Sequence, residues 1–271
     1  MKATWWSIGL GAAVALAGGI LAACDVSVGN GDFSVGLTSG KATDQWTRTY
    51  QLLAGGRLEI LNVNGRIDVE ATDGQTVEVT ADRTAKARTD DGARELLRGI
   101  EMREDVSAAS VRIETKALAS SLGSSQEVDY RVRVPRSTSL YVRTQNGSVN
   151  IDGVEGAVVA SSTNGGVLGK GLAGGVEAST TNGAIRLALD AVAAPGVKAE
   201  TVNGSITIDV PPQAKADIAA RCVNGSVSVT DLTIERSGEA SRRRVEGRVN
   251  GGGPRIEAAT TNGSIRITGR S

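Results

Sequence analysis

The chain has 271 residues, and its 30 basic and 30 acidic side chains give a formal net charge of zero. This balance argues against a nucleic-acid partner, because nucleic acids are bound through an excess of lysine and arginine. There is no histidine, which excludes histidine-based triads, general bases and zinc sites. Aromatic residues make up 3% of the chain, too few for surfaces that stack sugars or bases. No motif for a metal or a cofactor is found, and none is expected.

The N-terminus reads as a targeting segment. Lys2 supplies a positive charge, and an apolar run from Trp5 to Ala22 follows. The run is too short and too glycine-rich for a permanent membrane span. It ends in Leu21-Ala22-Ala23-Cys24, which resembles the lipobox of bacterial lipoproteins, in which the cysteine is lipidated and becomes the first residue. The resemblance implies a signal peptide over residues 1–23 and a membrane anchor on Cys24. The alternative is an ordinary secretory signal with a chance cysteine.

The residues after Cys24 are expected to form a tether. Residues 24–43 include many Gly, Ser and Asp, a composition typical of a flexible linker. In a host with two membranes, Asp25 implies retention at the inner membrane on its periplasmic face, because aspartate after the lipidated cysteine disfavours sorting to the outer membrane. Only Cys222 remains after Cys24, so the mature chain forms no internal disulfide.

The dipeptide Asn-Gly returns throughout the chain. The spacings of its asparagines from Asn146 to Asn224 are 18, 18, 21 and 21 residues, and Asn262 lies 38 residues further on, about two more periods. A fixed period indicates a repeat architecture. Aligned on Asn-Gly, the repeats carry Ala, then Thr or Ser, then Ile, Leu or Val on one face, and polar residues on the other. This alternation predicts strands with one buried face.

Two architectures fit these strands. Each Asn-Gly could be a two-residue hairpin turn in an antiparallel meander, or it could be the corner of one rung in a β-solenoid. A hairpin does not require the same residue at each offset in successive repeats, whereas stacked rungs do, and stacked asparagines form ladders. We therefore expect an all-β fold whose residues 136–271 form a solenoid of Asn-Gly rungs, each about 20 residues long. In it, Cys222 fills a position of the Thr column as a small buried side chain.

Residues 44–135 are expected to form an N-terminal β part that is continuous with the solenoid. Leu58–Val69 reads as a degenerate first rung, and residues 76–81, 111–115 and 128–134 alternate as strands. Between them, Ala93, Leu96, Leu97 and Ile100 recur at helical spacing. They predict a short helix, capped by Asp90 or Asp91, that covers an open end of the stack. Residues 234–253 interrupt the repeat as a solvated loop or hairpin, and Arg242, Arg243 and Arg244 are a weak candidate for an anion site.

These motifs together resemble a known family. The lipobox, the tether, the Leu58–Val69 segment, the helix, Val132-Arg133-Val134-Pro135 and the rungs of Asn-Gly-x-Ile are similar to the bacterial family of "putative adhesins". The resemblance runs from Leu52 to Ile267. It implies an envelope protein with a domain of unknown function built as a β-helix-like solenoid, and it supplies no catalytic residues.

Three functions are compatible with the sequence. The leading hypothesis is a lipid-anchored, non-catalytic module for binding, adhesion or scaffolding, whose partner is an envelope protein or a glycan. The alternative is a polysaccharide lyase or hydrolase, which would need clustered carboxylates. Asp152, Asp190, Asp209 and Asp231 follow the rungs at varying offsets, as solvated strand ends do, so we expect no enzyme. A third possibility is an accessory of a membrane-bound regulatory system.

Overall fold

The computed structural model describes residues 25–29, 32–36, 40–116, 123–237 and 241–270. The chain divides into two compact units, Met1–Thr38 and Ser39–Ser271. In the first, β1 (Asp25–Gly29) pairs antiparallel with β2 (Asp32–Gly36). Residues 24–43, expected as a tether, therefore contain two strands, and β3 (Gly40–Gln51) begins inside them as well. The valines and phenylalanine that alternate with Gly, Ser and Asp in β1 and β2 account for the strands, because alternation favours pairing.

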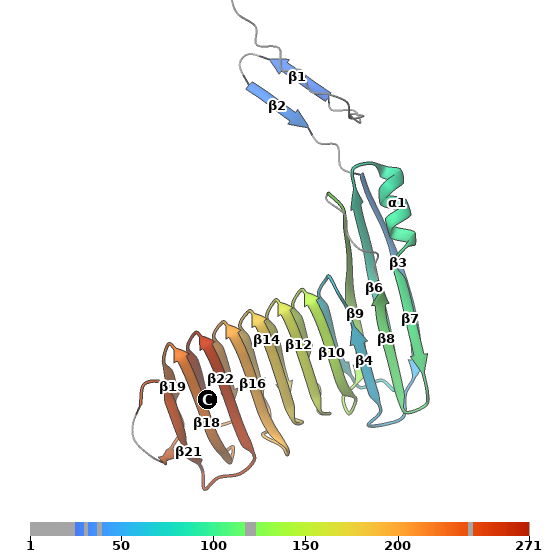
Figure 1. Cartoon of the computed structure of the whole chain (residues 1–271). Helices are drawn as coiled ribbons and strands as arrows, with labels where there is room; N and C mark the ends of the chain where they lie inside the picture. The colour runs from blue at the N-terminus through green and yellow to red at the C-terminus, as the bar shows by residue number, and fades with distance from the viewer. Residues whose placement is uncertain (1–24, 30–31, 37–39, 117–122, 238–240, 271) are drawn as a thin grey trace, which may run out of the picture. The chain divides into compact units, whose positions relative to one another are not determined.

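The second unit consists of two large sheets and the helix α1 (Asp90–Arg98) (Figure 1). One sheet has eleven strands, in the spatial order β20 (Ile234–Arg236), β21 (Arg244–Val249), β18 (Ala216–Asn224), β22 (Arg255–Asn262), β16 (Gly196–Asn203), β14 (Val176–Asn182), β12 (Val158–Asn164), β10 (Ser139–Asn146), β4 (Arg57–Leu61), β8 (Ser110–Lys116) and β7 (Glu101–Val106). The other has ten, in the order β19 (Val227–Thr230), β23 (Ile265–Gly269), β17 (Ile206–Val210), β15 (Ile185–Leu189), β13 (Val167–Leu172), β11 (Val149–Asp152), β5 (Ile67–Thr72), β9 (Ser125–Pro135), β6 (Thr76–Ala87) and β3.

The solenoid prediction is confirmed. The two strands of a rung, on either side of its Asn-Gly, lie in opposite sheets; Asn250-Gly251 is not such a corner, because β21 and β22 lie in the same sheet. Equivalent strands of stacked rungs are parallel and in register, so that Ala160 lies beside Ala178 and Ala178 beside Ala199. A meander would have paired them antiparallel. The two sheets enclose a narrow core, in which Ile185 and Ile206 are completely buried. Each such side chain contributes roughly 1.5–3 kcal/mol to stability.

The Asn-Gly corners are held by a ladder of side-chain amides. Asn164 Nδ2 donates to Asn146 Oδ1 at 2.7 Å, and Asn182 Nδ2 donates to Asn164 Oδ1 at 2.9 Å. Equivalent bonds continue the ladder, joining Asn64 to Asn146, Asn182 to Asn203, Asn203 to Asn262 and Asn262 to Asn224. Glycine follows because the neighbouring rung leaves no room for a Cβ atom, which at Gly204 would lie 1.8 Å from the Gly183 carbonyl oxygen.

The last two rungs do not follow chain order. The rung formed by β22 and β23 lies between two rungs that precede it in the sequence. One of them is formed by β16 and β17, and the other by β18 and β19. The 38 residues from Asn224 to Asn262 hold no additional rung, contrary to our expectation of two periods. They hold the hairpin β20–β21, and β21 pairs antiparallel with β18. The hairpin alternative for residues 234–253 is therefore correct, and β21 covers the edge of β18, which would otherwise expose unpaired backbone groups.

The other end of the stack departs from the repeat. The predicted first rung, β4 and β5, stacks on β10 and β11, and β8 and β9 add a further rung outside it. Beyond β9, the long strand β6 pairs antiparallel with β9, and β3 pairs antiparallel with β6. The helix α1 packs on these two strands with Ala93 buried. Its N-cap is Thr89, whose side chain accepts from Gly92 N, while Asp90 and Asp91 lie in the first turn. The cap predicted at Asp90 or Asp91 was thus misplaced, because threonine also caps helices well.

Candidate binding groove

A groove of about 1110 Å³ lies where four chain reversals of the N-terminal end come together. Its walls come from the last residues of β3 and the segments after β3, β5, β7 and β9, which are distant in sequence, and Glu155 after β11 also lines it. Tyr50 and Leu52 are buried beneath it, at 7% and 8% exposure. A concave, largely apolar surface with a few polar groups is the usual form of a binding site.

Two large apolar side chains in the wall of this groove face solvent. Leu53 is 63% exposed and Val106 is 52% exposed. The turn that carries Leu53 is fixed on both sides, because Leu53 N donates to Ala108 O at 3.0 Å and Gly56 N donates to Leu53 O at 2.8 Å. Exposed apolar side chains that share the wall of one groove, unlike single scattered ones, mark a surface that a partner can cover.

Two pairs of polar side chains lie at the groove. Arg136 Nε donates to Asp73 Oδ1 at 2.8 Å, and this bond raises the pKa of the guanidinium. Tyr50 Oη donates to Glu104 Oε2 at 2.7 Å. Burial and this hydrogen bond raise the pKa of Tyr50, so the phenol stays neutral at physiological pH. The groove therefore offers apolar contact and a few oriented hydrogen-bonding groups, with no nucleophile activated by a base.

The candidate residues from the sequence lie elsewhere. Cys24 is outside the described residues. The four aspartates lie on or just after four different strands. Asp190 is paired with Arg270 at 2.7 Å. The described residues contain no group of three Cys, Asp or Glu able to hold a metal ion. These aspartates are Asp152, Asp190, Asp209 and Asp231.

The remaining two candidates have structural positions. Cys222 is buried at 7% exposure beside Thr260, as its place in the Thr column predicted. The backbone of the arginine segment serves the fold, since Arg243 O accepts from Cys222 N and Arg242 O accepts from Val227 N, both at 2.8 Å. Arg244 is paired with Glu246 at 2.6 Å.

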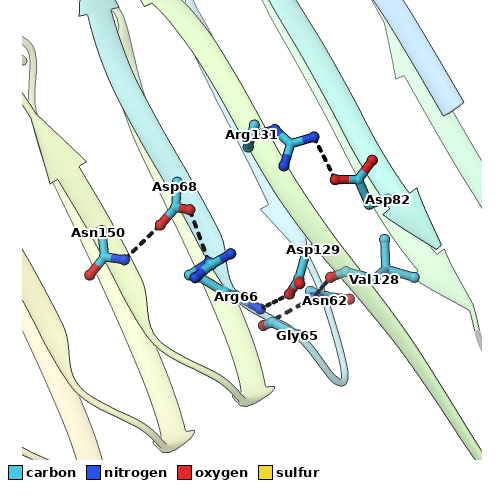
Figure 2. A network of polar contacts seen from close by, with 9 residues as sticks. All are labelled: Asn62, Gly65, Arg66, Asp68, Asp82, Val128, Asp129, Arg131 and Asn150. Carbon is cyan, nitrogen blue, oxygen red and sulfur yellow. Dashed lines mark hydrogen bonds and ion pairs between the residues drawn. The ribbon is translucent and has the colours of Figure 1, made fainter. Parts of the chain in front are cut away.

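A second group of polar residues joins the outermost rungs on the ten-stranded sheet (Figure 2). Asp68 accepts from Asn150 at 2.6 Å and pairs with Arg66 at 3.0 Å. Arg66 N in turn donates to Asp129 Oδ1 at 2.8 Å. Buried Asn62, which replaces the threonine of the other rungs, donates to Val128 O at 2.8 Å. Because these groups bond to one another across β11, β5 and β9, we assign them to holding the strands in register.

Sequence reasoning missed the groove. Its residues are spread from Thr49 to Glu155, and no motif links them. The one local signal was Leu52-Leu53-Ala54, an apolar run directly before Gly55-Gly56. A leucine within a turn is expected to be exposed, so it could have indicated an apolar surface. Only the fold shows that Val106 lies at the same surface.

Residues 25–268 match the family model described as Toastrack DUF4097. The chain belongs to this family. This match confirms the expected membership of a family with a domain of unknown function. No curated protein matches the chain.

One similar structure is a "putative cell adhesion protein" from Clostridium sporogenes, with 11% identity, a TM-score of 0.48, and coverage of 84% of this chain and 100% of that chain. Another is a "putative adhesin" from Bacteroides fragilis, with 13% identity, a TM-score of 0.31, and coverage of 83% and 97%. A third, from Parabacteroides distasonis, is a "putative lipid binding protein" with 10% identity, a TM-score of 0.23, and coverage of 83% and 96%. Within the described part of the chain, no helix is long and apolar enough to cross a membrane.

Proposed function

We propose that this Toastrack protein is a lipid-anchored, non-catalytic binding module of the bacterial cell envelope, and that the groove at its N-terminal end receives a protein partner. The observation that carries the proposal is the pair of solvent-facing apolar side chains, Leu53 and Val106, in the wall of that groove. Burying them on binding would contribute roughly 25 cal/mol per Å² of apolar surface.

The chemistry of the groove favours a protein over a glycan. Sugars are usually held by exposed aromatic rings, and the tyrosine of this groove lies beneath the surface at 7% exposure. Aliphatic side chains beside the paired charges of Arg136 and Asp73 suit the apolar core and polar rim of a protein interface. The pairing of Arg136 with Asp73 also argues against a catalytic role for these two groups, because they already neutralise one another.

The anchor and the location rest on the N-terminal sequence. The lipobox ending in Cys24 supports lipidation, and Asp25 supports the periplasmic face of the inner membrane in a host with two membranes. Labelling with radioactive palmitate in cells should mark the wild type and leave Cys24→Ala unlabelled. Equal labelling of the two would remove the anchor from the proposal without touching the groove.

The groove is tested by site-specific photo-cross-linking in the native envelope. A benzophenone amino acid at position 53 should give a discrete adduct with an envelope protein, and Val106→Lys in the same chain should abolish it. Position 223 is the matched control, because Val223 is 56% exposed on the opposite part of the stack. The same adducts from positions 53 and 223, or none from position 53, would refute the groove as the binding surface.

A further inference from the structure

The strand β3 presents an unusually long open edge. It is the outermost strand of the ten-stranded sheet, and in the described part of the chain its ladder partner is β6 alone, from Gly40↔Ala87 to Gln51↔Thr76. It has 12 residues, whereas β20 and β19, which end the two sheets on the other side, have 3 and 4. Natural sheets usually keep edge strands short or covered, because an open edge is a template for another strand.

The hydrogen-bond pattern shows which residues of β3 face this open edge. Tyr130 N donates to Arg66 O, so the even residues of β9 bond to β5 and its odd residues bond to β6. By the same alternation, the even residues of β3 bond to β6, and its odd residues direct their N–H and C=O groups outward. Thr47 agrees with this assignment, because its carbonyl oxygen accepts at 3.0 Å from the exposed guanidinium of Arg48.

The side chains of β3 are complementary to a second β3 strand running antiparallel. With the two-fold axis at Trp46, the charged Asp44 faces Arg48 of the second copy, and the small Ala42 faces the large Tyr50. On the outer surface, the pairs are Lys41 with Gln51, Thr43 with Thr49, and Gln45 with Thr47. Opposite charges and aromatic pairs across strands stabilise such a register.

Neighbouring registers lack this complementarity. A two-fold axis at Asp44 or at Arg48 would place like charges directly opposite, which destabilises a pair of strands. An axis at Gln45 would place Asp44 opposite Trp46, and an axis at Thr47 would place Asp44 opposite Tyr50, so in both registers the carboxylate has no cation directly across from it. The axis at Trp46 also extends two existing ion pairs, Arg83–Asp44 and Arg48–Glu104, into one series of alternating charge across both copies. The half-buried Trp46, with Arg48 4.9 Å from its ring centre, would meet its own counterpart.

We propose that β3 is a dimer interface, at which a second copy of this chain adds its own β3 antiparallel in the register centred on Trp46. The two ten-stranded sheets then form one continuous sheet. The pairing uses six outward-facing residues in each copy, Lys41, Thr43, Gln45, Thr47, Thr49 and Gln51, whose backbone groups need no rearrangement within the monomer. Because Thr49 and Gln51 also line one end of the groove, the second copy would border the groove at that end.

Disulfide trapping tests the register with Trp46 left intact. Gln45 and Thr47 of the second copy form a hydrogen-bonded pair with about 5.5 Å between their Cα atoms, which suits a disulfide. Full-length Gln45→Cys and Thr47→Cys chains, oxidised as a mixture in detergent, should give a covalent dimer in high yield. Each variant alone should give only the low background of the wild type. Equal yields from the mixture and from the separate variants would overturn the register.

A proline substitution tests the open edge itself. Thr47→Pro removes an N–H group that β6 does not use, so the monomer should keep its melting temperature while the dimer is lost. Thr80→Lys, on the same face of β6, should leave the dimer intact and serves as the control. Sedimentation of the full chain in detergent should show a dimer for the wild type and a monomer for Thr47→Pro.

Three results contradict the proposal. The wild type could sediment as a monomer at 100-fold above the concentrations of the trapping experiment, which would exclude the dimer. The dimer could persist in Thr47→Pro, which would place the interface elsewhere. The wild type could also form a complex only with an extended segment of another protein, which would make β3 a docking edge for a different partner.

Discussion

The middle of the stack and its N-terminal end are built by different means. From β10 to β17, the rungs repeat the side chains of their neighbours, and the amide ladder and the threonine column are continuous. The aliphatic column is broken only at Gly169, where β13 has an irregular register. At the N-terminal end, Tyr50, Tyr130, Asn62 and several ion pairs take the place of these columns. The regular region thus provides stability, and the surfaces proposed for partners lie where the repeat ends.

The largest expected effect is at a glycine of the regular region. Gly204→Ala would place a Cβ atom 1.8 Å from the Gly183 carbonyl oxygen, so the rungs must separate, at a cost of about 3 kcal/mol or more. The control is Gly74→Ala at the N-terminal end, where the nearest atom, Thr72 Oγ1, would be 3.3 Å away. Urea denaturation followed by circular dichroism measures both, and equal midpoints would contradict the role of close backbone approach.

A smaller effect is expected in the threonine column. Thr201 Oγ1 donates to Gly183 O at 3.0 Å and is 6% exposed, so Thr201→Val should lose about 1 kcal/mol. Thr181→Val is the matched control on the solvent face of the neighbouring strand, with an expected change below about 0.5 kcal/mol. Chemical denaturation measures the loss of unfolding free energy in both variants. Equal losses in Thr201→Val and Thr181→Val would refute the contribution of the threonine column.

The amide ladder should show a difference between its interior and its end. Asn203 donates to Asn182 at 2.9 Å and accepts from Asn262 at 2.7 Å, whereas Asn224 donates to Asn262 at 2.8 Å from the terminal rung. Asn203→Ala should therefore cost about 1 kcal/mol and Asn224→Ala about half as much. Thermal unfolding of the two variants measures the ratio. A larger loss of stability in Asn224→Ala than in Asn203→Ala would mean that these residues do not stabilise the protein through the hydrogen bonds of the ladder.

The smallest effect concerns the tyrosines of the N-terminal end at high pH. Burial raises the pKa of both Tyr50 and Tyr130 above the ordinary value near 10. Their stabilising contribution is therefore complete below about pH 10 and is lost as the pH rises toward the folded-state pKa. The urea concentration at the unfolding midpoint should decrease as the pH is raised from 9 to 11, and this decrease should be smaller in Tyr50→Phe. An identical decrease in the variant would exclude Tyr50 as a contributor.

The sequence predicted what depends on the side-chain columns. Ala160, Ala178 and Ala199 share one offset, and this identity is required only when rungs stack, so the solenoid, the ladder and the position of Cys222 could all be predicted. The same identity concealed the order of the last rungs. Because β18 and β22 both present Ala, then Cys or Thr, then Asn-Gly, either stacks equally well on β16, and sequence similarity carries no preference.

The groove and the open edge depend on long-range geometry. Leu53 and Val106 are 53 positions apart in the sequence, and no periodicity relates them. The alternation of β3 was also weak, because its inward positions include Asp44 and Arg48 as well as Trp46 and Tyr50. Edge strands tolerate charges at inward positions. The charged inward residues that weakened the alternation of β3 are therefore also the ones that mark it as an edge strand.

The displaced order of the last rungs makes the core depend on two strands that come late in the sequence. The strands β22 and β23 fill a space between rungs that precede them in the chain. Without them, β18 would keep its antiparallel partner β21 but would lose its parallel neighbour, and β16 and β17 would each expose one edge. Continuity of both sheets is therefore a property of the whole rung order, and its loss would expose unpaired backbone groups.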